Sequence, residues 1–284
     1  MESASDADWV IKASGVGVFD ALLESAVLEM RRPSQIVSFW DVDAPATLDR
    51  VQNLPNEPFR KLIPKFDMVL TYGGGKPVVD AYKRCGAQAC YPIYNGFDLN
   101  THYPVKSEQA FLADLSFLGN RLPDREARID EFFFKPAVAL PDKRFLLAGN
   151  GWDDKAKPEN IKNLGHLYSS AHNSFNCSAL AVLNVNRESM ARYGFSPATR
   201  VFEAAAAGAC IISDYWVGIE EFFEPSKEIL LANDGEEVTE ILRSLTPAHA
   251  RSIGQAACRR AKRDHTYSDR AEKLELILKS TFGQ

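Results

Sequence analysis

Short apolar runs alternate along the chain with stretches of helical spacing. In the first part, the apolar runs predict strands at Trp9–Lys12, Gln35–Phe39, Asp67–Thr71 and Ala89–Ile93. Apolar residues at helical intervals predict helices over Val18–Arg31 and Pro77–Cys85, and a polar, proline-bearing loop follows over Gln52–Pro58. This alternation is typical of βαβ units built on a parallel sheet.

A second series of the same kind begins near Ala110. Its predicted strands are Leu115–Leu118, Arg144–Ala148, Ala181–Val185, Cys210–Ser213 and Ile229–Ala232. Its predicted helices are Arg125–Leu140, Pro197–Ala207, Glu236–Leu245, Ala248–Asp264 and Asp269–Thr281. Tyr94–Lys106, with Asn95-Gly96 and Pro104, is predicted to link the two series. We therefore predict an α/β protein with two Rossmann-like lobes, residues 1–105 and 106–284.

Composition narrows the class of protein. The 284 residues are 45% hydrophobic and 25% charged, as in ordinary globular proteins. A net charge of −5 argues against a nucleic-acid partner. No apolar run is long enough to predict a membrane span, and Met1–Asp8 does not resemble a signal peptide. The five cysteines are odd in number and scattered, so we expect a reducing, cytoplasmic setting.

One predicted helix carries the most specific chemistry. Ser196 is placed to cap it, Pro197 suits its first position, and Gly208 suits its C-terminal turn. Four consecutive alanines, residues 204–207, leave little side-chain bulk, so a neighbour can approach closely.

The same helix presents polar groups at its start. Glu203 lies on the same side as Thr199 and Arg200, at spacings of four and three residues. A helix N-terminus can hold a phosphate, and a carboxylate one turn further in can accept hydrogen bonds from hydroxyls of the same ligand. Phosphate beside a diol indicates a nucleotide. The alternative is a tightly packed crossover helix in which Glu203 pairs only with Arg200.

Two glycine-containing loops follow strands of the second series. They read Gly119-Asn120-Arg121 and Gly149-Asn150-Gly151-Trp152. Ligands of open α/β sheets bind beyond the carboxyl ends of the strands. With the N-terminus of the Glu203 helix, these loops predict a ligand crevice at one edge of the second lobe.

Several segments, taken in order, resemble a known family. They are Tyr94-Asn95-Gly96-Phe97-Asp98, Phe117-Leu118-Gly119-Asn120-Arg121, Leu147-Ala148-Gly149-Asn150-Gly151, Asn163-Leu164-Gly165 and Thr199–Ile212. The set resembles the GT-B glycosyltransferases, and most of all the CgeB-like (spore maturation protein) branch of the group-1 enzymes. The resemblance extends over nearly the whole second lobe, from Leu112 to Leu278.

The resemblance implies a protein that moves a sugar from a nucleoside diphosphate donor to an acceptor of unknown kind: a glycan, lipid, protein or small molecule. The donor is a substrate, and neither a cofactor nor a metal is implied. Retention of anomeric configuration is implied too, as is a last helix that crosses back to the first lobe.

The resemblance also assigns residues to this site. Glu203 would hold the ribose hydroxyls. The N–H groups of Ala198, Thr199 and Arg200 would hold the diphosphate, together with the guanidinium of Arg200 or Arg121. Arg125 is a second candidate cation, and the alternative is that it pairs with Glu126 or Asp130. Gly119, Asn120 and Gly149, from the loops of the predicted crevice, complete the predicted donor site. Fixed positive charge, including that of Arg121, would stabilise the leaving group in place of a metal ion.

Two departures from the family pattern stand out. Members of the larger group often carry two glutamates eight positions apart, and here Phe195 stands where the first would be. The first lobe also has fewer strand–helix units than the family has, so we expect it to be truncated by about 70–100 residues.

Asp41-Val42-Asp43 follows a predicted strand and admits three interpretations. The spacing resembles the D-x-D metal–diphosphate motif of the other glycosyltransferase architecture. In a GT-B plan, Asp41 would instead orient or deprotonate an acceptor hydroxyl. The third interpretation is an Asx turn that opens the loop before Pro45.

Other candidates have simple structural alternatives. The loop Gly73-Gly74-Gly75 either contacts an anion or forms an ordinary strand–helix turn. Trp152 and Tyr168 either stack on a base or belong to the core. His166 and His172 have no nearby Cys or carboxylate in the sequence, so we expect no metal site there.

Three functions remain open from the sequence. They are a glycosyltransferase, a non-catalytic nucleotide-sugar-binding protein derived from one, and a related nucleotide-sugar enzyme such as an epimerase.

Overall fold

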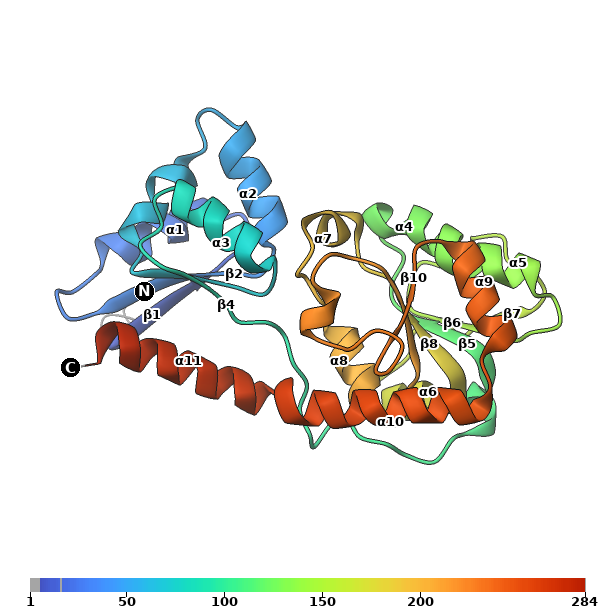
Figure 1. Cartoon of the computed structure of the whole chain (residues 1–284). Helices are drawn as coiled ribbons and strands as arrows, with labels where there is room; N and C mark the ends of the chain where they lie inside the picture. Colours follow the sequence, from blue (N-terminus) through green and yellow to red (C-terminus); the bar gives the residue numbers. More distant parts are fainter. Residues whose placement is uncertain (1–5, 16, 284) are drawn as a thin grey trace. The chain divides into compact units, whose positions relative to one another are not determined.

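The computed structural model describes residues 6–15 and 17–283 and contains two compact α/β units (Figure 1). The first unit comprises the chain as far as Tyr94 together with Arg192–Ser196, and the second comprises Asn95–Ala191 and the chain from Pro197 onward. Each has its own parallel sheet, so the predicted fold class is confirmed. Residues 1–5, which form most of the stretch compared with a signal peptide, lie outside the described residues.

The first unit is a four-stranded parallel sheet in the order β1-β2-β3-β4. Its strands are β1 (Trp9–Ala13), β2 (Ile36–Asp41), β3 (Met68–Thr71) and β4 (Cys90–Pro92), and its helices are α1 (Asp20–Glu29), α2 (Ala44–Asn53) and α3 (Gly75–Arg84). Because neighbouring strands follow one another in sequence, right-handed crossovers place all three helices on one face of the sheet (Figure 1). The four predicted strands and two predicted helices are present, within two residues at each end.

The helix α2 was not predicted from the sequence. Its residues 44–53 include Pro45, at which the sequence predicts a loop. Pro45 occupies the first turn, where a missing backbone N–H costs no hydrogen bond. Leu48 and Val51 of this helix are fully buried in the first unit's core, beside Phe39 of β2.

The second unit is a six-stranded parallel sheet in the order β10-β9-β8-β5-β6-β7. Its strands are β5 (Ala113–Leu118), β6 (Phe145–Ala148), β7 (Ile161–Asn163), β8 (Ala179–Asn184), β9 (Ile211–Asp214) and β10 (Leu230–Ala232). When the strands are numbered 1 to 6 along the chain, this order is 6-5-4-1-2-3, which is the Rossmann order. The strands before β8 are added on one side of β5, and those from β8 onward are added on its other side, so the order reverses between β5 and β8. Of these strands, only the three-residue β7 was not predicted.

The second unit contains eight labelled helices among its described residues. They are α4 (Pro123–Ile129), α5 (Lys135–Ala139), α6 (His172–Ser178), α7 (Glu188–Tyr193, whose last two residues cluster with the first unit), α8 (Thr199–Ala206), α9 (Gly235–Ser244), α10 (Pro247–Asp264) and α11 (Tyr267–Phe282). The short helices α6 and α7 were not predicted.

The single helix predicted over Arg125–Leu140 is wrong in detail. The structure has α4, a π-helical turn over Asp130–Phe134, and then α5. Pro136 explains the interruption, because proline has no N–H and its ring excludes the carbonyl four residues earlier. The widened turn buries three consecutive phenylalanines, Phe132, Phe133 and Phe134, in the core.

The helix α8 ends as predicted but begins differently. Gly208 has φ +80°, and the N–H groups of Gly208 and Ala209 bond to the carbonyls of Ala205 and Ala204, at 2.9 and 3.1 Å. This is a Schellman ending. The predicted Ser196 cap is wrong: the helix begins at Thr199, and the Ser196 hydroxyl bonds to the Gly194 carbonyl instead.

The alanine run of α8 does allow a close neighbour, which is α10. The Cys258 thiol of α10 lies 3.3 Å from the Ala206 carbonyl oxygen. Gly254 of α10 comes so near that a Cβ there would lie 2.2 Å from the Gly208 carbonyl oxygen. The two helices therefore pack backbone to backbone.

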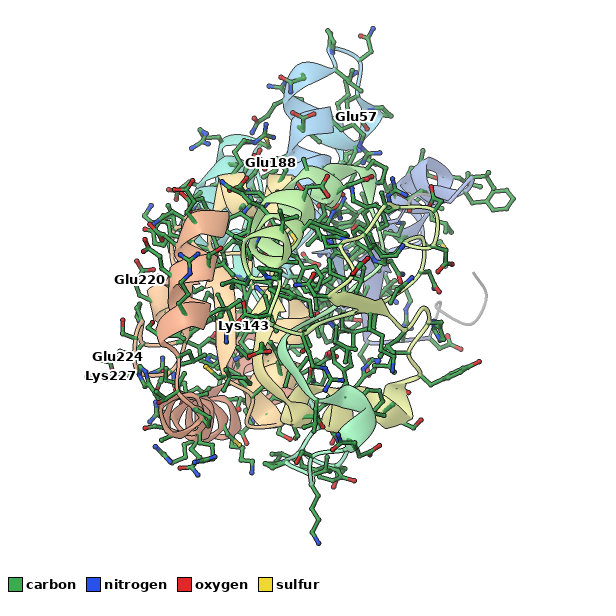
Figure 2. The ribbon with its side chains drawn as sticks, turned by 90° about the vertical axis from the view of Figure 1, so that its right-hand side faces the viewer. Glu57, Lys143, Glu188, Glu220, Glu224 and Lys227 are labelled. Atoms are coloured by element: carbon green, nitrogen blue, oxygen red, sulfur yellow. The ribbon has the colours of Figure 1, made fainter. Side chains whose placement is uncertain are left out.

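Charged side chains cover the outside of the second unit (Figure 2). Many are paired locally, as Lys227 is with Glu224 at 2.5 Å. Among the described residues, no helix has both the length and the apolar composition that crossing a bilayer requires.

The contact between α8 and α10 predicts a stability effect. We expect Gly254→Val to reduce the free energy of unfolding of the second unit by about 2–3 kcal/mol, because added methyl groups must separate two packed backbones. Urea unfolding followed by the fluorescence of Trp152 and Trp216 measures it. Gly17→Val is the control, since nothing lies within 4 Å of a Cβ built at Gly17; equal losses from both variants would contradict the close packing.

Candidate functional site

A cavity of about 200 Å³ lies where the second sheet reverses its winding. It is lined by the ends of two adjacent strands, β5 and β8, and by the starts of α4 and α8. The residues that line it are Phe117, Leu118, Gly119, Asn120, Leu122, Arg125, Leu183, Asn184, Val185, Ala198 and Arg200. This is the position at which open α/β sheets bind ligands, because the loops after β5 and β8 diverge there.

A larger cavity, of about 590 Å³, lies at the other ends of the same strands. Its lining includes Ala113 and Ala179, the first residues of β5 and β8. The first residue of α10, Pro247, also lines it, but none of the residues predicted to bind the donor does. The smaller cavity is therefore the better candidate for the donor site.

Two arginines meet at the smaller cavity without carboxylate hydrogen bonds. Within the described chain, Nη1 of Arg200 and Nε of Arg125 are buried atoms that have no hydrogen-bond partner. Burial lowers the pKa of both guanidinium groups. The charge of Asp124 opposes this shift at Arg125, and the charge of Arg200 adds to it. Arg125 also donates to the Asn120 carbonyl. Two desolvated cations side by side favour an anion with more than one charge.

The start of α8 adds backbone donors to these cations. Ala198 precedes the helix, and no side chain caps it. Among the described residues, the helix therefore begins without a side-chain cap, and it presents the N–H groups of Thr199 and Arg200 and the positive end of its dipole. Ala198 and Arg200 both line the cavity.

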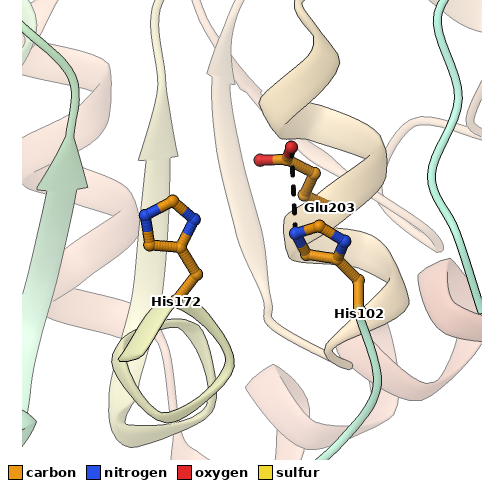
Figure 3. Close-up of side chains that lie close together, drawn as sticks. All are labelled: His102, His172 and Glu203. Atoms are coloured by element: carbon orange, nitrogen blue, oxygen red, sulfur yellow. Dashed lines mark ion pairs between the residues drawn. The ribbon is translucent and has the colours of Figure 1, made fainter. Parts of the chain in front are cut away.

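Glu203 lies in the second turn of α8, with a side chain about one-fifth exposed. Its nearest basic neighbours are Nη1 of Arg200, 3.6 Å from Oε2, and the ring of His102, whose Nε2 is 3.8 Å from Oε1 (Figure 3). Both distances exceed that of a hydrogen bond. The Arg200–Glu203 pair of the alternative interpretation thus exists but leaves the carboxylate able to accept hydroxyl hydrogen bonds.

Two histidines lie beside Glu203, which the sequence did not indicate. His102 comes from the segment after β4, and His172 is the first residue of α6 (Figure 3). Burial, followed by the charge of Arg200, lowers the pKa of His172, which keeps its ring neutral near pH 7.

Arg121 is held away from the cavity by carboxylates. Its guanidinium lies 2.7 Å from Glu126 and 3.0 Å from Asp154. The hydrogen bond from Arg121, with a second from Lys155, lowers the pKa of Glu126 to about 2. Arg121 does not belong to the cavity lining.

Gly119 and Gly149 allow two loops to meet. A Cβ at Gly149, whose φ is +124°, would lie 2.2 Å from the Gly119 carbonyl oxygen. That oxygen accepts a hydrogen bond of 2.7 Å from the Trp152 indole, and the Asn120 side chain accepts one of 2.9 Å from the Asn150 N–H. Gly149 thus shapes the loop beside the cavity, while Gly119 and Asn120 line it.

Asp41 is fully buried at the end of β2. Its carboxylate accepts hydrogen bonds from the hydroxyls of Ser14 and Thr47, each at 3.0 Å, and from that of Tyr82. The Asp43 N–H donates to the same carboxylate at 3.1 Å, which makes the Asx turn that was the third interpretation of Asp41-Val42-Asp43.

Comparison with known proteins identifies the family. A family model described as glycosyl transferase-like matches residues 125–275, more than half of the chain. The chain belongs to this glycosyl transferase-like family. No curated protein matches it significantly.

Solved structures show the fold of this glycosyltransferase. HepE of Anabaena, in complex with UDP-glucose, has a TM-score of 0.69 at 12% identity, over 98% of this chain and 80% of that one. Sucrose-phosphate synthase from Thermosynechococcus elongatus has a TM-score of 0.70 at 13% identity, over 99% of this chain and 76% of that one. T4 phage BGT, in complex with UDP-glucose, has a TM-score of 0.60 at 16% identity, over 99% of this chain and 84% of that one. These similarities show the predicted GT-B fold.

Other candidate residues of the glycosyltransferase have structural roles. Cβ atoms built at Gly73 and Gly75 would lie 2.9 and 2.7 Å from side-chain atoms of Ser196 and Phe195, so this loop is glycine-rich because that segment packs on it. Trp152 is buried against Phe117 and Phe134, as the core interpretation has it. Tyr168 is exposed and contacts the ring of His166.

The buried carboxylate of Asp41 predicts a pH effect on stability. Burial raises its pKa above the unfolded value of 3.8, against the opposing effect of its hydrogen bonds, so the folded state binds this proton more tightly. The resulting stability is present below the unfolded pKa and lost as the pH rises through the folded one. We expect the free energy of unfolding of the wild type, minus that of Asp41→Asn, to fall as the pH rises above about 4, the ordinary pKa of an aspartate. Urea unfolding at several pH values measures it, and a difference that rises with pH would contradict the assignment.

Proposed function

We propose that this glycosyltransferase transfers a sugar from a nucleoside diphosphate donor bound at the cavity between β5 and β8. One observation carries the proposal: two half-buried guanidinium groups line the cavity at the start of α8, the helix that presents Glu203 one turn further on. Among the described residues, each group has a buried nitrogen that makes no hydrogen bond. HepE and T4 phage BGT, which share the fold, were solved in complexes with UDP-glucose.

Each group of the site has a separate task. Arg200 and Arg125 bind the two phosphates, with help from the N–H groups at Ala198, Thr199 and Arg200. Glu203 accepts hydrogen bonds from the two ribose hydroxyls. Gly119 and Asn120 form the wall beside the nucleotide.

The reaction follows from charges fixed by the fold. As the bond to the sugar breaks, negative charge develops on the leaving nucleoside diphosphate, and the two guanidinium groups stabilise it without a metal ion. The ordered segments that resemble the CgeB-like branch support membership of that branch, and with it retention of the sugar's anomeric configuration. The acceptor is a glycan, lipid, protein or small molecule, and five free cysteines favour a reducing, cytoplasmic setting.

Arg121 and Asp41 receive positioning roles in this proposal. Arg121 fixes the loop after β5 through Glu126 and Asp154. Asp41 fixes the loop after β2 through its Asx turn.

Binding of UDP and of uridine separates the two halves of the donor site. We expect Arg200→Gln and Arg125→Gln each to weaken UDP binding about 10- to 100-fold, because each loses a charge-assisted hydrogen bond to phosphate. Uridine binding should change little in these variants. Glu203→Gln should weaken both ligands, since the ribose is common to them. Isothermal titration calorimetry measures all three.

Arg121→Gln is the matched control for the two arginines. Its charge is already neutralised by carboxylates, so UDP affinity should stay within about twofold. A large loss of UDP affinity in Arg121→Gln, with none in Arg125→Gln, would overturn the assignment of Arg125 as a phosphate-binding residue.

A transfer assay tests the activity itself. We expect release of UDP, or of another nucleoside diphosphate, from one member of a panel of nucleotide sugars, at a rate that excess EDTA does not reduce. Proton NMR of the product would show the anomeric configuration of the donor retained. Nucleotide binding with no donor hydrolysed or transferred would favour the non-catalytic alternative, and activity lost in EDTA would overturn metal independence.

A further inference from the structure

Three side chains from distant parts of the second unit converge on one point. His102, His172 and Glu203 each offer a ligand atom, and these atoms all lie within 4.8 Å of one another. In Figure 3, both imidazole rings turn a nitrogen toward the Glu203 carboxylate. Two imidazoles and a carboxylate form a set of ligands that transition metals bind.

The other nitrogen of each ring is already bonded to the protein. His102 Nδ1 lies 2.9 Å from the Thr101 hydroxyl, and His172 Nε2 lies 3.3 Å from the Leu167 carbonyl. Such bonding fixes the direction of both rings, and the Leu167 carbonyl, which can only accept, also fixes the tautomer of His172. This bonding leaves Nε2 of His102 and Nδ1 of His172 as the free ligand atoms.

The two histidines are also held in register by one side chain. Asn173, next to His172 on α6, donates to the Thr101 carbonyl at 2.9 Å and accepts from the Tyr103 N–H at 3.4 Å. These are the residues on either side of His102. The segment that carries His102 is therefore fastened to the helix that carries His172.

We propose that His102, His172 and Glu203 form a binding site for Zn²⁺, with water as the fourth ligand. A tetrahedral zinc ion with bonds of about 2.0–2.1 Å holds its ligands about 3.4 Å apart, so side-chain adjustments of about 1 Å close the site. Two imidazoles exclude Mg²⁺ as the preferred ion, because Mg²⁺ prefers oxygen ligands. Oε1 of Glu203 faces His102 and Oε2 faces Arg200, so the ion can use the first oxygen while the arginine keeps the second.

The site has a consequence for donor binding, which rests on the proposed function. Glu203 cannot hold a zinc ion and both ribose hydroxyls with the same oxygens. Zinc therefore competes with the nucleotide and inhibits transfer, although the transfer itself uses no metal.

Cobalt is the probe for the site, because Co²⁺ replaces Zn²⁺ and absorbs visible light strongly in tetrahedral sites. We expect the EDTA-treated full chain to bind one Co²⁺ with tetrahedral absorption, and added Zn²⁺ to remove that absorption. His102→Ala and His172→Ala should each weaken Co²⁺ binding at least tenfold. His249→Ala, which removes an exposed histidine of α10, should leave it unchanged.

Circular dichroism of each variant checks that it is folded. No tetrahedral absorption in the wild type, or an equal loss in His249→Ala, would overturn the zinc site. In a folded His102→Ala or His172→Ala protein, undiminished Co²⁺ binding would overturn it too.

A UDP titration separates the zinc site from the proposed function. In the wild type, saturating Zn²⁺ should raise the apparent Kd of UDP at least tenfold, and in His172→Ala it should have little effect. Zinc binding without any change in UDP affinity would overturn the competition. Failure of the metal-free protein to bind UDP would count against the donor site alone, because the Co²⁺ absorption does not depend on it.

Discussion

Two positive charges are confined to a small crevice without hydrogen bonds to carboxylates. Arg125 and Arg200 each have a buried nitrogen that makes no hydrogen bond within the described chain, and each has its pKa lowered by burial. Burying an unpaired polar group costs about 1–3 kcal/mol, and more for a charged one. A fold tolerates such a cost where a ligand offsets it. The reversal of strand order between β5 and β8 opens the space, and the backbone packing of α8 against α10 fixes the helix that carries Arg200.

Most of the fold could be predicted because its signals are local. Apolar runs located every strand but β7, and Gly208 marked the end of α8. Features that depend on tertiary contacts were missed. Pro45 obscured α2, although Leu48 and Val51 have helical spacing, and Pro136 opens a π-helical turn inside one predicted helix.

In the candidate site too, the local signals could be predicted and the tertiary contacts could not. The sequence indicates charge, but it does not show which charge is already neutralised. Arg121 and Arg125 lie four residues apart, and only the fold reveals that Glu126 and Asp154 engage the first and leave the second to the cavity. Likewise, His102, His172 and Glu203 are far apart in the chain, and no spacing rule brings them together.

The segment Arg192–Ser196 has a consequence for biosynthesis. It belongs to the first unit although most of the second unit's sheet precedes it in the chain. Phe195, with φ +47°, accepts a hydrogen bond from the Gly74 N–H at 2.8 Å, so it is an integral part of the glycine loop's packing. A ribosome must therefore translate four strands of the second unit before the first unit has all its parts. The order of synthesis cannot be the order of folding, and the first unit waits, incompletely packed, while β5 to β8 emerge.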